Sequence, residues 1–344
     1  MQPITRYFPG GNTPEGFFSY YGEILDTHSA GKLAVIKGGP GTGKSTFLKK
    51  LAKTLISQGE TVTYLHCSSD PNSLDGIFLP ARNSLVMDGT APHITDVRYP
   101  GVCDILLNFC DFIGEVSEGE TILSESRLAK NTFLEGYCYL RSAKALLDLM
   151  HAGSERAILP NEIHSFAGEI AKRISSCPAN GYRKTVFLSA ITADGCCNYL
   201  SENLTDYHVI SLDTQVGDAS FLVMEAVKNA CGLRNADMIV CPCPMNPRKA
   251  EHLLFPSANL ALITSNSYHY DSDADEIVSF SDFITHRPSN GEVESLYDDI
   301  LQRAVQTFSS AREHHNRLED VYRTVTDYSA IDSYYQKTLE FLIS

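Results

Sequence analysis

The sequence lacks a long apolar run, an N-terminal secretory signal and an excess of basic residues. No segment approaches the uninterrupted apolar stretch that a membrane-spanning helix needs. The opening MQPITRYFPGGN has no charged stretch followed by an apolar one, so we expect no signal peptide and a cytoplasmic location. The 28 basic and 42 acidic residues give a net charge of −14. This charge repels polyanions, so we expect neither nucleic acid nor a membrane as a partner.

The ten cysteines lack the spacing of a disulfide framework or a zinc site. They are scattered through 344 residues, whereas disulfide frameworks are typical of short secreted domains. The CPC segment at 241–243 and the adjacent pair Cys196 and Cys197 have no two-residue ligand spacing and no histidines at zinc-site distances. We therefore expect reduced structural thiols.

The strongest positive signal is GGPGTGKS at residues 38–45, which satisfies the phosphate-loop pattern G-x-x-x-x-G-K-[ST]. The apolar run LAVIK before it predicts a buried strand, and the segment KSTFLKKLAKTLISQ after it has apolar residues at helical spacing. Strand, glycine loop and helix follow one another as a nucleotide-binding loop requires. The alternative, a glycine-rich turn that only caps a helix, would not need the complete motif in this context.

Each residue type in this loop has a chemical reason. Glycines let backbone N–H groups turn inward around phosphates, and the helix N-terminus adds the positive end of its dipole. Lys44 would reach the β and γ phosphates, the Ser45 hydroxyl would bind Mg²⁺, and Thr46 would donate to the α-phosphate. The predicted nucleotide-binding residues are Gly38, Gly39, Pro40, Gly41, Thr42, Gly43, Lys44, Ser45 and Thr46.

A second magnesium ligand is predicted at Asp88, which ends the apolar run SLVMD and so lies at the carboxyl edge of a parallel sheet. The alternative is that Asp88 starts a turn, because Asp-Gly is a common turn dipeptide. The next residue is Gly89, where many P-loop motor ATPases have a glutamate that orients water. We therefore expect slow hydrolysis.

Polar residues also follow the predicted strand TVTYLH, in the segment HCSSDPNSLD at 66–75. Asp70 could act there as a catalytic base toward a water or an acceptor. The alternative is that Asp70 belongs to a turn that caps a following helix. His93 is similarly open between a loop hydrogen bond and a contact with phosphate.

An internal repeat appears when residues 33–93 are placed against 209–269 without a gap, at an offset of 176. The identities include Cys67 with Cys243, Pro71 with Pro247, Pro80 with Pro256, Asn83 with Asn259, and His93 with His269. The alternative is that two α/β units share period and composition by accident.

The second copy has lost the phosphate-binding residues. TQVGDASF at 214–221 faces the loop GGPGTGKS, with Ser220 opposite Lys44, and Thr264 faces Asp88. Without these side chains, a half of this kind cannot hold Mg-nucleotide in the usual way. We expect one competent site, in the N-terminal half.

The phosphate loop and the segments HCSSDPNSLDGIFLP, DGTAPH and CPCPMNPRKAEHLLFP give the chain a resemblance to a family of uncharacterised bacterial ATPases built from two tandem P-loop NTPase-like halves. The resemblance covers nearly the whole chain and implies ATP as the nucleotide. In agreement, no guanine-reading NKxD motif occurs. The family commonly has two loop-like halves, so the missing lysine here is a departure that implies a regulatory or scaffolding second half.

The predicted fold is therefore α/β, a tandem P-loop NTPase in which parallel sheets are flanked by helices. We divide the chain into a P-loop domain at 1–176 and a degenerate P-loop-like domain at 177–344, with a linker at 177–184. Each domain is expected to end in a helical hairpin. The predicted helices are 119–152 with 161–175, and 293–324 with 329–343.

The predicted function is Mg-dependent ATP binding with slow hydrolysis. One alternative is a phosphotransferase that acts on a small metabolite, since phosphoryl transfer needs mainly positioning and charge stabilisation. Another is a non-catalytic nucleotide switch that docks a protein partner through its second half. Arg248, Lys249 and Arg287 are the basic side chains of that half that could reach the first site.

Overall fold

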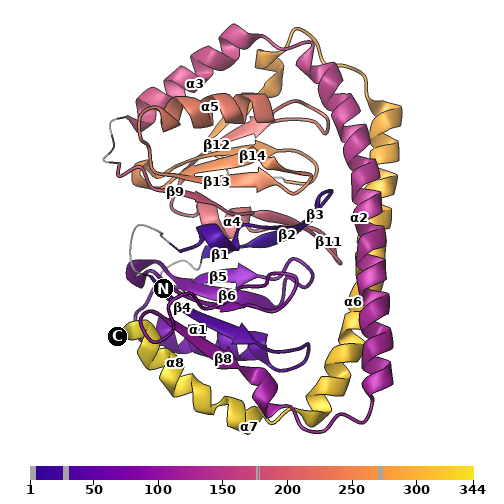
Figure 1. Ribbon diagram of the computed structural model, residues 1–344. Helices are drawn as coiled ribbons and strands as arrows, with labels where there is room; N and C mark the ends of the chain where they lie inside the picture. Colours follow the sequence, from indigo (N-terminus) through magenta and orange to yellow (C-terminus); the bar gives the residue numbers. More distant parts are fainter. Residues whose placement is uncertain (1–4, 26–30, 176, 178, 270–273) are drawn as a thin grey trace.

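The computed structural model describes residues 5–25, 31–175, 177, 179–269 and 274–344, and contains two six-stranded sheets flanked by helices (Figure 1). The first sheet has the order β1 (Thr5–Tyr7), β5 (Thr63–His66), β6 (Leu74–Leu79), β7 (Ser84–Asp88), β4 (Lys32–Lys37) and β8 (Asp104–Asn108). The second has the order β9 (Arg183–Thr185), β13 (Met238–Cys243), β14 (Asn246–Phe255), β15 (Leu260–Ser265), β12 (His208–Asp213) and β16 (Glu276–Ser279). The α/β class is as predicted.

Each sheet is mainly parallel, as predicted, but contains one strand that is antiparallel to both of its neighbours. In the first sheet β4 pairs in parallel with β7 and β8, and β1 pairs in parallel with β5, but β6 is antiparallel to both of its neighbours. The turn predicted around Asp70 is followed by strand β6 rather than by a helix. The reason is burial, because all six residues of β6 are covered between β5 and β7.

The two sheets share one strand order, with β9, β13, β14, β15, β12 and β16 in the places of β1, β5, β6, β7, β4 and β8. The agreement extends to single residues at the offset of 176. Asn83 and Asn259 both have positive φ, 45° and 47°. Their carbonyl oxygens accept the backbone N–H groups of Lys32 and His208, at 3.1 Å and 2.7 Å. The shared topology supports the sequence alignment, and a duplication remains its predicted origin.

Two β-hairpins lie between the sheets, β2 (Gly10–Thr13) with β3 (Gly16–Ser19), and β10 (Ser189–Thr192) with β11 (Gly195–Asn198) (Figure 1). Their turns are alike, since Thr13 Oγ1 donates to Gly16 O and Thr192 Oγ1 donates to Gly195 O, both at 2.8 Å. The hairpins touch through Asn12, whose buried side chain donates to the carbonyl oxygen of Ile191 at 3.0 Å.

Two long helices, α2 (Gly119–Glu155) and α6 (Gly291–Val325), run side by side past both sheets (Figure 1). They bury residues such as Leu140, Leu147, Leu301 and Phe308 against each other. Their contact is close at Gly136, where an added Cβ would lie 2.5 Å from the Phe308 ring.

Each long helix is followed by shorter helices that pack against the sheet of the other half. Helix α3 (Pro160–Ile174), which follows α2, packs against α5 (Phe221–Gly232) in the core of the second sheet. Helices α7 (Tyr328–Ile331) and α8 (Ser333–Ile343), which follow α6, pack beside α1 (Lys44–Ser57) in the core of the first. The helical appendages are therefore exchanged. The domain boundary at 176 and 177 stays a prediction, and packing crosses it.

The remaining elements are short. They are the helix α4 (Leu200–Leu204) and the 3-10 helices η1 (Tyr21–Glu23), η2 (Pro80–Arg82), η3 (Phe109–Phe112), η4 (Pro256–Ala258) and η5 (Phe280–Phe283). Part of the predicted linker at 177–184 belongs to β9, and residue 178 lies outside the described residues. All ten cysteines are free thiols. Among the described helices, none has the length and apolar character to cross a bilayer.

Candidate functional site

The predicted phosphate loop lies between β4 and α1, so the expected order of strand, loop and helix is confirmed. Gly41 and Gly43 have φ of 71° and 83°, a left-handed conformation that favours glycine. No side chain caps the helix, and within the described chain its first backbone hydrogen bond runs from Phe47 N–H to Gly43 O at 2.9 Å. The N–H groups of residues 43–46 therefore have no acceptor among the described residues.

Lys44 folds back over its own loop. Its Nζ donates to the carbonyl oxygens of Gly38 at 2.6 Å and Gly39 at 2.8 Å. The same nitrogen lies 3.5 Å from Asp88 Oδ2, and only 14% of the Lys44 side chain is exposed. Phosphate oxygens bind an ammonium more strongly than neutral carbonyls do, so a phosphate could replace the two carbonyls.

Asp88 is placed at the carboxyl edge of the sheet as predicted, with β7 parallel to the strand that leads into the loop. Its Oδ1 accepts the backbone N–H of Thr90 at 2.8 Å, and Oδ2 faces Lys44 and, at 3.8 Å, His93 Nε2. Burial acts to raise the pKa of Asp88, but His93 and Lys44 outweigh it and the pKa is lowered. The carboxylate of Asp88 is therefore charged. Its hydrogen bond with the N–H of Thr90 also fits the alternative, in which Asp88 starts a turn.

The two hydroxyl residues of the motif have different surroundings. Ser45 Oγ accepts the backbone N–H of Leu74 at 3.0 Å, which ties the start of α1 to β6. Thr46 is exposed on the first turn of the same helix. The predicted magnesium pair Ser45 and Asp88 thus comes from the first turn of α1, which begins at Lys44, and from the end of β7.

Asp70 takes part in the turn between β5 and β6. Its Oδ1 accepts the N–H of Asn72 at 3.1 Å, and its Oδ2 accepts the hydroxyl of Ser73 at 2.6 Å. These bonds match the structural alternative for this residue. The catalytic role of Asp70 stays an untested prediction, with both carboxylate oxygens engaged locally.

Asp75 is a site residue that the sequence reasoning missed. It is buried on β6, and its carboxylate lies with Asp88 and His93 in one cluster whose ligand atoms are within 4.8 Å of one another. Burial raises the pKa of Asp75. Burial opposes charge on His93 too, but the two carboxylates outweigh it and raise the pKa of His93. The signal that could have found Asp75 is the repeat, because the same offset pairs it with Glu251.

The C-terminal end of α6 covers the outside of the phosphate loop. A Cβ added to Gly41 would lie 2.4 Å from the carbonyl oxygen of Glu319. The Tyr328 hydroxyl donates to Gly41 O at 2.7 Å, and the Tyr322 ring lies beside Gly39. A segment from the far end of the chain thus touches the first site.

In the second half, the loop at 214–221 follows a similar path. Gly217, which aligns with Gly41, has φ of 88°. It is covered in turn by α2, since a Cβ added there would lie 2.6 Å from Met150 Cβ. In each half, the loop is thus covered by the long helix of the other half.

The second loop differs from the first in its hydrogen bonds. Asp218 Oδ2 accepts the N–H of Gln215 at 2.8 Å, and Arg287 pairs with the same carboxylate at 2.9 Å. The N–H of Ala219 donates to Ser154 Oγ of α2 at 3.0 Å. The N–H groups of Gln215 and Ala219 are therefore bonded to protein oxygens, and the Asp218 carboxylate in this loop would repel a phosphate. The loss of the motif therefore has a structural counterpart.

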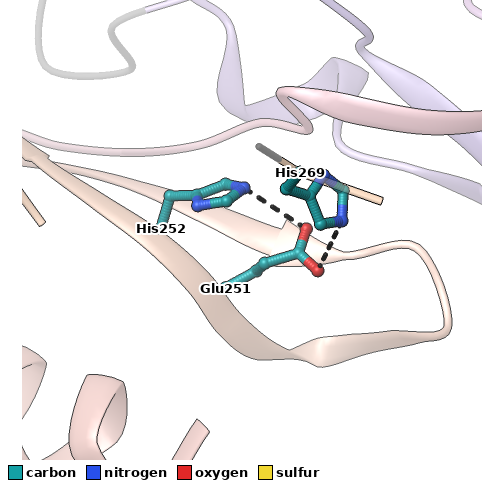
Figure 2. Close-up of side chains that lie close together, drawn as sticks. All are labelled: Glu251, His252 and His269. Carbon is teal, nitrogen blue, oxygen red and sulfur yellow. Dashed lines mark ion pairs between the residues drawn. The ribbon is translucent and has the colours of Figure 1, made fainter. Parts of the chain in front are cut away.

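Beside the second loop, Glu251 lies between His252 and His269 (Figure 2). Its oxygens are 3.5 Å from His252 Nε2 and 3.1 Å from His269 Nε2, and Ser189 Oγ donates to it at 2.9 Å. Burial acts to raise the pKa of Glu251, but the histidines outweigh it and the pKa is lowered. The carboxylate borders a cavity of about 100 Å³ that also reaches Tyr297 of α6.

The other two basic side chains of the second half also have local partners. Arg248 Nη2 pairs with Glu15 of the first hairpin at 2.7 Å. Lys249 Nζ lies 5.0 Å from the centre of the Phe221 ring. Like Arg287 with Asp218, both cations thus contact residues outside the first loop.

No protein-family model, no curated protein and no solved structure matched this chain.

Proposed function

We propose that the N-terminal half binds Mg-ATP and hydrolyses it slowly. The observation that carries this proposal is the uncapped N-terminus of α1, where the N–H groups of residues 43–46 have no acceptor among the described residues and the Lys44 side chain is only 14% exposed. Backbone donors, a helix dipole and an ammonium at one place are what a phosphate chain requires. The resemblance to bacterial ATPases motivates the choice of ATP.

The residues of the loop fit this ligand. Gly41 and Gly43 hold the backbone in a left-handed conformation, and a phosphate would have to displace Lys44 Nζ only from two neutral carbonyls and from Asp88. Ser45 and Asp88 would hold Mg²⁺, which when bound neutralises charge on the β and γ phosphates. In this proposal Lys44 stabilises the γ-phosphate, and Gly89 leaves attacking water without a carboxylate to orient it.

Turnover tests the proposal. Phosphate release from ATP is measured with the full-length protein at several Mg²⁺ concentrations, beside Lys44→Ala. We expect slow, Mg-dependent release that is lost in the variant. Equal release by both proteins would refute the ATPase, and Ser220→Ala, altered at the aligned position of the second half, serves as a matched control.

A second candidate function, a nucleotide-dependent switch, is favoured by one observation. Glu319 and Tyr328 of the C-terminal segment touch Gly41 directly, so a ligand that moves the loop must also displace or tighten α6. Hydrogen exchange with and without ATP tests this. A change in the amides of residues 319–331 supports the switch, and a change confined to the loop and α1 contradicts it.

A further inference from the structure

Three metal-ligating side chains converge on the first sheet next to Lys44. Asp75 comes from β6, Asp88 from the end of β7, and His93 from the loop that follows β7. One ligand atom of each lies within 4.8 Å of the other two. Two neighbouring strands and the loop that follows one of them therefore bring two carboxylates and one imidazole close together.

The imidazole of His93 has no hydrogen-bond partner there. Both of its ring nitrogens are buried and unbonded within the described residues, and the side chain is 8% exposed. Its Nε2 lies 3.8 Å from Asp88 Oδ2, too far for a hydrogen bond. The hydroxyl of Tyr21, whose ring stacks on that of His93 at 5.0 Å, is also buried and unbonded in the described chain. Buried polar groups are normally bonded, so these atoms indicate a missing partner.

We propose that Asp75, Asp88 and His93 form a binding site for a divalent first-row transition-metal ion, of which Mn²⁺ and Zn²⁺ are the test cases. Carboxylates suit Mn²⁺ and imidazole suits Zn²⁺ and its neighbours, whereas Mg²⁺ takes oxygen ligands and keeps several waters. The two ligand sets share Asp88, but the one proposed here replaces the Ser45 hydroxyl of the nucleotide-bound Mg²⁺ site by the Asp75 carboxylate and the His93 imidazole. This ion binds without nucleotide.

The second half provides an internal comparison, because Glu251 and His269 occupy the positions of Asp75 and His93. The cluster of Figure 2 has lost one carboxylate, since Thr264 aligns with Asp88. The additional histidine of this cluster, His252, does not replace the lost carboxylate as a ligand. His252 Nδ1 accepts the backbone N–H of Thr264 at 3.1 Å, so in the neutral ring the proton is on Nε2, the nitrogen that faces Glu251.

A proton on Nε2 leaves His252 without a lone pair for a metal. The Glu251 carboxylate also accepts the hydroxyl of Ser189 and forms ion pairs with the two histidines. Within the described residues His252 Nε2 and His269 Nδ1 are also buried and unbonded, so the second cluster differs from the first in its missing carboxylate ligand rather than in its hydrogen bonds. This difference makes His269 the matched control for His93.

A variant at Lys44 distinguishes metal binding from nucleotide binding. Its Nζ lies 3.5 Å from Asp88 Oδ2, where its charge opposes a cation. Lys44→Ala should therefore leave the affinity for the metal unchanged or raise it, although it removes the proposed phosphate contact. Loss of ATP binding and loss of metal binding can thus be told apart in the same set of proteins.

The experiment uses the full-length, metal-free protein without nucleotide. Mn²⁺ alone is titrated and free Mn²⁺ is counted by electron paramagnetic resonance, and Zn²⁺ alone is titrated in parallel by calorimetry. We expect one site per chain that excess Mg²⁺ does not empty, with ¹⁴N coupling to bound Mn²⁺ from an imidazole. His93→Gln should remove that coupling and weaken binding by more than about tenfold, a loss that even outer-shell changes produce at metal sites.

The variants make the result decisive. Asp75→Asn keeps shape and removes a ligand charge, so it should weaken binding as His93→Gln does, while His269→Gln should bind like the unaltered protein. Circular dichroism confirms that each variant is folded. Absence of binding by both ions, or binding that His93→Gln leaves intact and His269→Gln removes, would overturn the proposal.

Discussion

Replacing Gly41 by alanine tests how the C-terminal helix meets the phosphate loop. The φ of Gly41 is 71°, which costs a residue with a Cβ about 1–2 kcal/mol. In addition, the new Cβ would lie 2.4 Å from Glu319 O, a backbone atom that can move only with α6. Overpacking of this kind costs about 1–3 kcal/mol more. We expect Gly41→Ala to lower the free energy of unfolding by about 2–5 kcal/mol in total.

The matched control is Gly101→Ala. Gly101 has φ of 78°, but a Cβ added there meets nothing within 4 Å. It should therefore lose only the conformational part, about 1–2 kcal/mol. Both variants are compared by urea unfolding followed by circular dichroism. Equal losses would show that Glu319 does not press on Gly41 and would contradict the contact of α6 with the phosphate loop.

Two further predictions concern the exchanged helices. Leu342 of α8 is fully buried in the core of the first sheet, so Leu342→Ala should lower the free energy of unfolding in urea by about 2–5 kcal/mol. The control Leu149→Ala, at an exposed position of α2, should lower it by less than about 0.5 kcal/mol. A similarly small loss for both variants would contradict the packing of α8. Glu276 of β16 is held by Arg173 of α3 and by His208, and these hydrogen bonds lower its pKa from 4.5 to about 2. A carboxyl with a lowered pKa stabilises the fold above its unfolded value, so this contribution should be complete above pH 4.5 and disappear as the pH falls toward 2. Glu276→Gln should flatten the pH dependence of stability in that window, by a small amount because the side chain is 42% exposed, and an unchanged profile would contradict the link.

The local features of the first site were predictable because each has a local sequence signature. The phosphate loop is defined by contiguous residues, and Asp88 by its place at the end of an apolar run. The strand order of the two sheets follows the alignment at an offset of 176. Strand β6 was missed because a turn motif precedes it, and turn chemistry does not specify whether a strand or a helix comes next.

The exchanged helices and the acid-histidine cluster depend on tertiary contacts. The apolar face of α3 or α8 predicts burial, but two sheets of the same design offer similar surfaces, and the lengths of α2 and α6 decide which one is covered. Asp75 belongs to no motif and lies within a buried strand. Its pairing with Glu251 in the repeat was visible in the sequence, but its nearness to His93 and Asp88 required the fold.

The most direct test of the central proposal is ATP binding by three proteins, the unaltered chain, Lys44→Ala and Ser220→Ala, measured by calorimetry in the presence of Mg²⁺. One site per chain is expected. A charged hydrogen bond contributes about 1.5–3 kcal/mol, which corresponds to a loss of roughly 10- to 150-fold in affinity for Lys44→Ala. Ser220→Ala, at the aligned position of the second half, should bind like the unaltered chain. Undiminished binding by Lys44→Ala, or no binding by the unaltered chain, would contradict a nucleotide site at the first loop.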